Sequence, residues 1–577
     1  MRKKKNLALR PYLEAIEGHC RPLAKEELLR IVLALAGEVT EGEREGFLAR
    51  IAGLLPGALK RAEKKGDVEA FLDRIEDLGQ EIKERMAAIE DGTFWDEGGD
   101  GDGDGYYDDE PDSLSDEQKE ELAECFGVAG GLFMSGRLAA AKTIYARLFD
   151  LLREITDQPV GWLGIDVDLR EARARYCRTV YELAEEKARV EEVVAAMEVE
   201  AEGRLFDQVP DDYPQLRDLL DAQTGDPSDF TAFLPAWEKA LAAKGFSRGR
   251  LAALRLEAAF MRGGVAAVAT LAREWREQQP MGYLAWLDRL AEAAEWPALR
   301  DAAQEALSTL SAGEVKASAA GFLVMAGQQL TDDKTLLTGK RERFRALPKA
   351  SSLLSLLAEA GRQGGREREL DVAIHLLTER QTGGEFAGQS LPVKALLMAG
   401  RLDEALARVT KVKEVGWSYD SSVAVVFAAI LHLVSGGHAD FPLIQGLMRE
   451  YAGLGGIPFD DPEADEASDA LMYREISLGL GLVDHKPADL TRCHDWARKA
   501  GEERVNLIIS NKKRHAYDRA ALILGALAEA RVATGDKAAA DHLLHDYYQL
   551  RYNRYSAFRK EVKAVVGSSP ALRLLRL

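Results

Sequence analysis

The sequence predicts an all-α protein whose larger part is an α-solenoid of stacked helical hairpins. Ala and Leu dominate the apolar residues, which favours helix because β-branched residues lose side-chain freedom in helices. Apolar residues recur at helical spacing, and glycine-centred turns recur roughly every 34 residues. A chain of 577 residues is too long for one compact core. A repeat array reaches that length by stacking units.

Residues 1–91 form the first predicted domain, a small helical one. Its first part contains apolar residues that share one helix face, namely Leu28, Ile31, Val32 and Leu35. Its last part carries a longer apolar face, made by Phe71, Leu72, Ile75, Leu78, Ile82 and Met86. Both faces have the spacing of amphipathic helices, so this domain is expected to be entirely helical.

Residues 92–114 are predicted to be an acidic, flexible linker. The stretch 90–121 holds fifteen Asp and Glu residues and one Lys, which gives it a charge of −14 out of −20 for the whole chain. Glycine alternates with aspartate there, so too little apolar surface exists to offset the entropy of ordering. The next helix is expected to begin at Ser115, because Ser115 and Gln118 form a capping-box pattern.

The third predicted domain is the solenoid itself, residues 115–577, with candidate divisions near residue 225 and at 457–470. Three segments share one theme, which is an apolar helix end, a glycine and a small-residue helix start: Leu132–Lys142, Leu396–Leu406 and Arg531–Asp541. The glycine supplies the left-handed conformation that closes a helix. Related turns are expected at Gly263-Gly264, Trp296-Pro297, Gly364-Gly365 and Gly436-Gly437.

The spacing of these turns carries a family resemblance. Gly364, Gly400 and Gly436 are 36 residues apart, and Gly501 and Gly535 are 34 apart if Gly501 also marks a turn. A period near 34 resembles that of the tetratricopeptide repeat (TPR), a helix–turn–helix unit. The resemblance implies TPR-like helical hairpins that bind peptides on a repeat surface, although most units lack the early Trp and closing Pro of that family.

One TPR-like unit stands out, at residues 126–149. It has Gly136 at the turn, Ala140 or Ala141 at the small position and Tyr145 at the aromatic position. At the C-terminus, the segments Lys513–Ala521 and Tyr555–Glu561 resemble the closing helices of bacterial proteins that carry SWIM-type zinc fingers. The Cys and His pattern of that finger is absent, so the resemblance implies a helical framework without zinc or DNA binding.

Composition favours a cytoplasmic protein. Four cysteines lie far apart in the chain, so they suit neither a disulfide framework nor a zinc module: Cys20, Cys125, Cys177 and Cys493. The basic start, residues 1–5, resembles a signal peptide, but Arg10 and Pro11 interrupt the apolar run that should follow. No window approaches the roughly 18 uncharged apolar residues of a membrane span.

The acidic linker contains a weak calcium candidate. Asp100, Asp102, Asp104 and Asp108 match the first, third, fifth and ninth positions of an EF-hand loop. The twelfth position, which should supply a bidentate Glu, is Pro111. A solvated acidic linker is the favoured interpretation, and no cofactor is expected. A second acidic stretch, 460–469, is interpreted as a surface loop between repeats.

Other motifs for metal binding or catalysis are incomplete. His542 and His545 share a helix face but lack a third ligand, and adjacent residues in Cys493-His494-Asp495 point in different directions. The segment 338–341 lacks the first glycine and the Ser or Thr of a phosphate-binding loop. Gly479-Leu-Gly481 does not follow a strand. The sequence therefore predicts no catalytic residues and no enzyme.

A basic cluster near the C-terminus is the candidate partner-binding or anion-binding site. Its residues are Lys512, Lys513, Arg514, Arg519, Arg551, Arg554, Arg559 and Lys560. Tyr547, Tyr548, Tyr552 and Tyr555 are interleaved with it, as in a surface that stacks bases and contacts phosphates. The alternatives are an acidic protein partner, the chain's own acidic linker, or an ordinary solvated surface.

The leading functional hypothesis is a non-enzymatic scaffold or adaptor that binds a peptide or partner protein on a helical-repeat surface. A first alternative is a regulator or protease substrate in a bacterial defence system, CRISPR-associated systems included. A second is nucleic-acid binding through the basic C-terminal helices. A protein or peptide partner is thus expected, nucleic acid is the weaker alternative, and no membrane is expected. The oligomeric state stays open.

Overall fold

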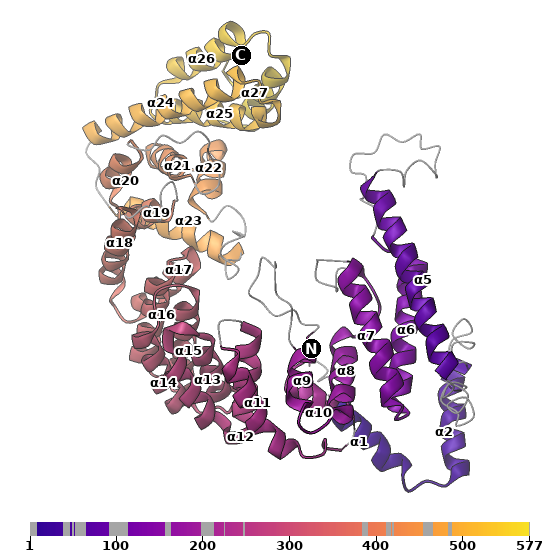
Figure 1. Cartoon of the computed structure of the whole chain (residues 1–577). Coiled ribbons are helices and arrows are strands. Elements are labelled where there is room, and N and C mark those ends of the chain that lie inside the picture. The colour runs from indigo at the N-terminus through magenta and orange to yellow at the C-terminus, as the bar shows by residue number, and fades with distance from the viewer. Residues whose placement is uncertain are drawn as a thin grey trace. The chain divides into compact units, whose positions relative to one another are not determined.

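The computed structural model of the chain is all-helical wherever it is described. It describes residues 9–38, 47–48, 51, 65–91, 113–155, 163–197, 213–223, 225–245, 249–382, 390–410, 417, 421–453, 466–482 and 487–575. These residues form 25 α-helices and contain no strand. Consecutive helices pack against each other as hairpins (Figure 1), so the predicted all-α helical-repeat architecture is confirmed.

The helices belong to two compact units, Met1–Trp286 and Leu287–Leu577, which divide inside α13 (Met281–Glu292). The first unit contains α1 (Leu9–Cys20), α2 (Lys25–Glu38), α5 (Lys65–Glu90), α6 (Asp116–Met134), α7 (Leu138–Ile155), α8 (Leu169–Leu183), α9 (Arg189–Met197), α10 (Leu216–Asp221), α11 (Phe230–Ala243), α12 (Gly249–Trp275) and the 3₁₀ turn η4 (Arg276–Gln278). Each unit is described separately below.

The hairpin α6–α7 covers the helix–turn–helix unit predicted at residues 126–149. Ser115 caps α6, since its Oγ accepts from the Gln118 N–H at 3.2 Å and the Gln118 side chain accepts from the Ser115 N–H at 3.0 Å. Gly136 adopts a φ of 76° at the turn. Ala141 and Tyr145 are fully buried on α7. The predicted helix start and turn are therefore confirmed here, and Ala141 and Tyr145 face the core.

Helix α5 packs against α7, and its apolar face enters the core of α6–α8. Ile75, Leu78 and Ile82 are buried there, together with Leu114, which lies at the end of the predicted linker. Residues on both sides of segment 92–112 therefore share one core. Segment 92–112 lies outside the described residues, and independent folding of residues 1–91 stays a prediction.

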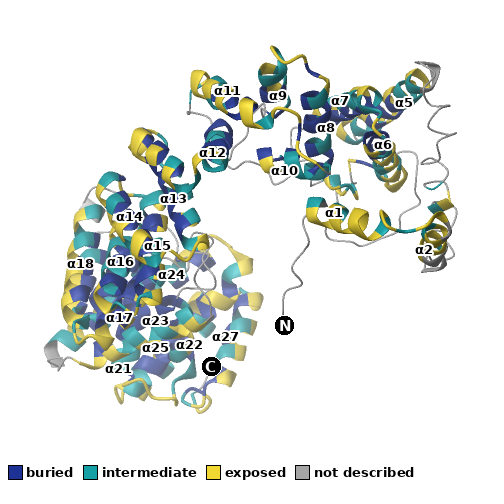
Figure 2. Ribbon diagram, turned by 90° about the horizontal axis from the view of Figure 1, so that it is seen from below, coloured by how far each residue is buried: buried dark blue, intermediate teal, exposed yellow. Residues whose placement is uncertain are grey.

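Helices α1 and α2 contribute little to the described core of the first unit (Figure 2). Arg10 on α1 bonds Asp226 at 2.8 Å, beyond the end of α10. The helical spacing predicted for α2 is confirmed, yet Ile31, Val32 and Leu35 are 40%, 37% and 52% exposed. The apolar face recognised in the sequence is therefore a helix face that the described residues leave uncovered.

The second unit continues the hairpin pattern to the C-terminus. Its helices are α14 (Trp296–Thr309), α15 (Glu314–Gln329), α16 (Asp333–Ala346), α17 (Ala350–Arg362), α18 (Arg366–Thr382), α19 (Leu391–Met398), α20 (Leu402–Val409), α21 (Ser422–Val434), α22 (Pro442–Ala452), α23 (Glu466–Gly481), α24 (Pro487–Ser510), α25 (Tyr517–Ala533), α26 (Lys537–His545) and α27 (Ser556–Ser568). A 3₁₀ turn, η5 (Arg514–Ala516), precedes α25, and a π-helical turn, η6 (Asp546–Arg551), follows α26.

Most of the predicted turn glycines occupy turns. Gly364, Gly400, Gly437 and Gly535 all have φ between 62° and 84° at helix ends, and Gly264 (φ 61°) breaks α12 into two helical parts. The prediction for Gly501 is wrong. Gly501 lies inside α24, where a Cβ would come within 2.8 Å of Phe427 and 2.9 Å of Leu527, so its small size permits close helix packing.

One continuous apolar core runs from α16 to the C-terminal helices of the second unit. Helices α21 and α25 are its centre, because most residues of each are buried. Helix α25 packs against α21, α22, α24, α26 and α27. Helix α25 is thus enclosed by five helices, and the predicted basic cluster lies on α25 itself, on α27 and in the turns that precede these two helices.

Two carboxylates, of the buried Glu529 and the half-buried Glu257, cap the N-termini of helices that are distant in sequence. In the second unit, Glu529 on α25 accepts from the N–H groups of Leu443 and Ile444, at 3.1 and 3.0 Å, and from the Ser569 hydroxyl at 2.6 Å. In the first unit, Glu257 on α12 accepts from the first two N–H groups of α10, at 2.6 and 2.7 Å. Each satisfies donors that a helix start leaves without partners.

Candidate interaction surface

The predicted basic cluster begins at the turn between α24 and α25. Lys512 has a φ of 54°, and the Lys512 and Lys513 N–H groups bond back to the Ile509 and Ile508 carbonyls. This is the reverse turn that closes a helix with one left-handed residue. Because the backbone reverses here, Lys512, Lys513 and Arg514 are all exposed.

The second part of the cluster lies at the turn between η6 and α27. Arg551 is the last residue of η6, Arg554 lies in the turn, and Arg559 and Lys560 follow on the first turns of α27. Arg551, Arg554 and Lys560 are exposed and Arg559 is half-buried. The sequence from 547 to 560 contains no acidic residue, so this turn is locally positive.

Ring and hydroxyl contacts bring the two turns together. Tyr517, the first residue of α25, packs its ring 5.9 Å from that of Phe558, the third residue of α27. The Tyr552 hydroxyl donates to Asn506 Oδ1 of α24 at 2.9 Å. The start of α27 therefore lies beside the start of α25 and the end of α24. The structure places both halves of the predicted cluster at one end of the C-terminal helices.

Three of the eight predicted cations are held by their neighbours. Arg519 pairs with Glu450 at 2.5 Å, and Arg551 pairs with Asp546 at 2.7 Å. Arg559 lies over the Tyr548 ring, 4.3 Å from its centroid, and donates to the Asn553 carbonyl at 3.4 Å. The charges of these three side chains are therefore compensated by contacts within the protein.

Five of the eight cations remain available, and they define the basic end: Lys512, Lys513, Arg514, Arg554 and Lys560. No described residue forms an ion pair with any of them. The basic end is therefore an uncompensated positive surface on a chain whose net charge is −20. Long-range attraction of an anionic partner is the physical property that such a surface confers.

Of the tyrosines near the basic end, Tyr547 belongs to the core, and Tyr548, Tyr552 and Tyr555 are half-buried against it. Tyr547 is fully buried, and burial raises its pKa to about 12. The Tyr552 ring lies 5.9, 5.5 and 6.0 Å from the rings of Tyr547, Tyr555 and Phe558. These rings pack tilted or edge-to-face against one another, so the sequence-based expectation of an aromatic platform for nucleic-acid bases is not matched by this geometry.

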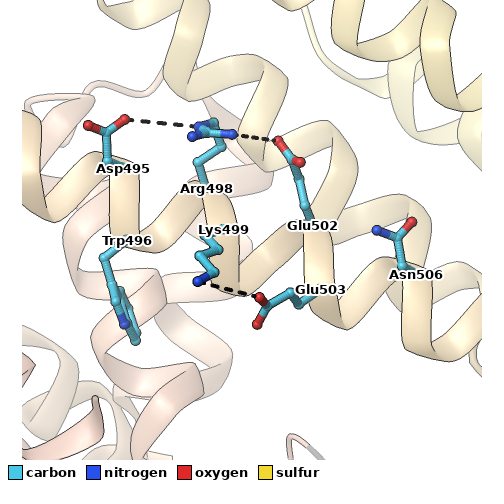
Figure 3. Close-up of a pocket in the computed structure, with 7 residues that line it drawn as sticks. All are labelled: Asp495, Trp496, Arg498, Lys499, Glu502, Glu503 and Asn506. Carbon is cyan, nitrogen blue, oxygen red and sulfur yellow. Dashed lines mark hydrogen bonds and ion pairs between the residues drawn. The ribbon is translucent and has the colours of Figure 1, made fainter.

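A shallow hollow of about 660 Å³ lies along the surface of α24 (Figure 3). Its lining residues are Asp495, Trp496, Arg498, Lys499, Glu502, Glu503 and Asn506. Asn506 connects it to the turn before α27, because Asn506 accepts the Tyr552 hydroxyl. The hollow therefore adjoins the basic end. The hollow was not predicted from the sequence. The pattern that indicates it is Trp496 among charged residues spaced three and four positions apart.

Charges in the hollow are mixed and mutually paired (Figure 3). Arg498 lies 4.0 Å from Asp495 and 3.4 Å from Glu502, and Lys499 lies 4.0 Å from Glu503. Trp496 is half-buried and packs its inner side on the apolar core. Exposed pairs of this kind contribute little to stability, so their charges can be re-paired by a bound polypeptide.

The other candidate sites do not assemble in the described structure. The calcium candidates Asp100, Asp102, Asp104 and Asp108, and residues 460–465 of the acidic stretch, lie outside the described residues. The loop predicted for 460–469 is wrong at its end, because residues 466–469 form the first turn of α23. Among described residues, no group of three or more His, Cys, Asp or Glu side chains could hold a metal ion, and this includes the surroundings of His542 and His545.

The rejected catalytic motifs are parts of helices. Cys493 is buried in α24, and burial raises the pKa of its thiol, which lowers its reactivity. Burial lowers the pKa of the adjacent His494. The phosphate-loop-like segment 338–341 lies inside α16, where Lys340 and Arg341 pair with Glu359 and Glu369.

Comparisons with known proteins leave the family open. No protein-family model matches the chain, and no curated protein sequence matches it significantly. Among the described helices, none is both long enough and apolar enough to cross a membrane.

Proposed function

We propose that this protein is a non-enzymatic interaction scaffold that binds a partner protein or peptide through its helical-repeat surface. The observation that carries the proposal is the basic end, five exposed cations without ion-pair partners beside a mixed-charge hollow. Such groups recognise an oppositely charged surface and set the rate and register of association. An adaptor needs a rigid helical frame to hold them, and the packed core beneath α24–α27 supplies one.

The two family resemblances found in the sequence support this proposal. TPR-like spacing of the turn glycines supports a repeat that presents a peptide-binding surface. The similarity of the last helices to those of SWIM-type zinc-finger proteins supports a shared helical framework, and a bacterial cytoplasmic protein fits both resemblances. The two alternatives, a protease substrate in a defence system and a nucleic-acid binder, are outcomes that the experiment distinguishes.

The test is partner capture followed by reconstitution. Immobilised full-length protein is incubated with lysate of the native host, with and without nuclease, at low and moderate ionic strength. The wild type is compared with a full-length variant whose charges at the basic end are reversed. A chain that lacks residues 507–577 would be a poor comparison, because that deletion would remove α25 from the core. We expect a nuclease-resistant protein partner that forms a stoichiometric complex when both components are purified.

Two results would contradict the proposal. Recovery of nucleic acid alone, lost steeply with added salt, would indicate phosphate binding instead. Specific cleavage of this chain by a captured protease, without a stable complex, would indicate a substrate rather than a scaffold.

A further inference from the structure

We propose that the basic end binds an acidic segment of a partner polypeptide, whose following residues lie along the α24 hollow. This inference rests on the proposed interaction function and specifies the site and the chemistry of the partner. It concerns the five cations of the basic end together with Trp496 and the charged residues that line the hollow.

The charge arrangement is the first support. The two stretches that form the basic end, 511–517 and 547–560, contain no Asp or Glu, although 96 of the 577 residues are acidic. Like charges that share one end of a helix group repel each other. Bound carboxylates relieve that repulsion, so the surface favours an anionic partner over an apolar one.

The backbone of the turn between α24 and α25 indicates which kind of anion the basic end can bind. The N–H groups of Lys512, Lys513 and Arg514 all bond to carbonyls of the same turn or of α24, at 2.9, 3.1 and 2.9 Å. None is left to cradle a phosphate, as the loops that bind nucleotides do. Only flexible side chains reach outward, and they suit several spaced carboxylates better than one compact phosphate.

The neighbouring residues favour polypeptide over nucleic acid. Tyr547 is buried, the Tyr552 hydroxyl is bonded to Asn506, and Arg559 lies over the Tyr548 ring, so these three tyrosines are engaged within the protein rather than arranged as a platform for bases. The hollow beside the basic end carries the carboxylates of Asp495, Glu502 and Glu503. These would repel a continuous phosphate backbone, whereas a polypeptide can follow its acidic residues with basic or neutral ones.

The experiment measures binding of the full chain to fluorescein-labelled oligoglutamate by fluorescence anisotropy, at low ionic strength. An oligodeoxythymidine of equal charge is the competing anion. The test variant is Lys512→Glu/Arg554→Glu, which reverses one charge in each turn. The matched control is Lys537→Glu/Arg573→Glu, which makes the same charge change at the exposed first residue of α26 and at an exposed residue after α27.

We expect the test variant to weaken oligoglutamate binding at least about tenfold, because two attractive charges become repulsive. The control variant should change it by less than about twofold. Both variants should keep the thermal unfolding profile of the wild type, since all four side chains are exposed. Equal weakening by the two variants would show a diffuse charge effect and overturn the proposal.

Two further outcomes would also overturn it. One is undetectable binding of oligoglutamate to the wild type, and the other is tighter binding of the oligodeoxythymidine. Failure here is separable from failure of the proposed function. A protein partner captured equally by wild type and by Lys512→Glu/Arg554→Glu would retain the scaffold function and exclude this site.

Discussion

Glu529 illustrates how single residues hold the second unit together. Helix α22 begins with Pro442, which has no N–H, so Leu443 and Ile444 provide its first donors. Both donate to the Glu529 carboxylate, 85 and 86 residues later in the chain. A buried donor without a partner costs roughly 1–3 kcal/mol, so this carboxylate links the fold of α22 to that of α25.

The first prediction concerns the removal of this cap. We expect Glu529→Ala to destabilise the second unit by about 2–4 kcal/mol, because it leaves buried donors unpaired and opens a cavity. Glu529→Gln should cost much less, since an amide oxygen can still accept both bonds. Hydrogen exchange read by mass spectrometry should show faster exchange at residues 443–444 in the alanine variant.

Glu257 supplies the matched control for Glu529. Glu257→Ala should accelerate exchange at residues 216–217, where Glu257 caps α10, and leave residues 443–444 unchanged. Unaltered exchange at 443–444 in Glu529→Ala would show that the buried carboxylate does not cap α22.

The second prediction concerns how the contribution of Glu529 to stability depends on pH. Burial raises the pKa of Glu529 above its ordinary value of 4.5, although bonds from Ser569 and two amides oppose the shift. A raised folded-state pKa stabilises the fold below the unfolded value, and this contribution is lost as pH rises through the folded pKa. Wild type should therefore lose stability relative to Glu529→Gln between about pH 4 and pH 7.

Urea unfolding of both proteins across that range measures this difference, in which all other titrating groups cancel. A wild type that gains stability relative to Glu529→Gln with rising pH would mean that the hydrogen bonds outweigh burial.

At the scale of elements, α15 and α16 approach each other through glycine. A Cβ at Gly327 would lie 2.6 Å from the Leu336 backbone nitrogen, and one at Gly339 would lie 2.8 Å from that of Val324. Backbone atoms cannot move aside as side chains do. The two glycines therefore set how closely this hairpin packs.

The third prediction uses a glycine pair on one helix. Gly327→Ala should destabilise the second unit by about 1–3 kcal/mol through overpacking. Gly321→Ala, on the same helix with nothing within 4 Å of its Cβ position, should stabilise by roughly 0.5–1 kcal/mol, because alanine favours helix. Thermal unfolding of both variants measures the contrast. A Gly327→Ala variant as stable as Gly321→Ala would show that the helices are not in close contact there.

Glycines also show how far elements can be predicted from sequence. Gly136, Gly400 and Gly535 were recognisable as turns because each separates an apolar helix end from a small-residue helix start. Gly501 has the repeat spacing of 34 residues from Gly535, yet it lies within α24, facing Phe427. A turn glycine and a packing glycine look alike until the neighbouring helix is known.

The candidate site was predictable to a similar degree. All eight basic residues of the sequence prediction lie on α25, on α27, at the end of η6 or in the two turns that precede α25 and α27. Which of them stay unpaired was not predictable. Arg519 is neutralised by Glu450, 69 residues earlier, and only the folded chain brings such a pair together. The tyrosines enter the core for the same reason.

At the scale of the whole molecule, periodicity predicted the hairpin architecture but not the grouping of helices. A repeat pattern reports contacts between neighbours in the chain, which is why the hairpins were recognisable. The core shared by α5 and α7 joins residues 71 positions apart, as the Lys83–Glu154 pair does. The division of the chain at residues 286 and 287 leaves no local signal in the composition either.

The central claim is that this chain binds its partner without altering it chemically or being altered by it. The most direct measurement follows the reconstituted complex by hydrogen exchange and by intact mass. The account predicts slower exchange in segments 493–516 and 547–560 on binding, with both protein masses unchanged. A change in the partner's mass would identify an enzyme, and cleavage of this chain would identify a substrate. Either result would contradict the scaffold account.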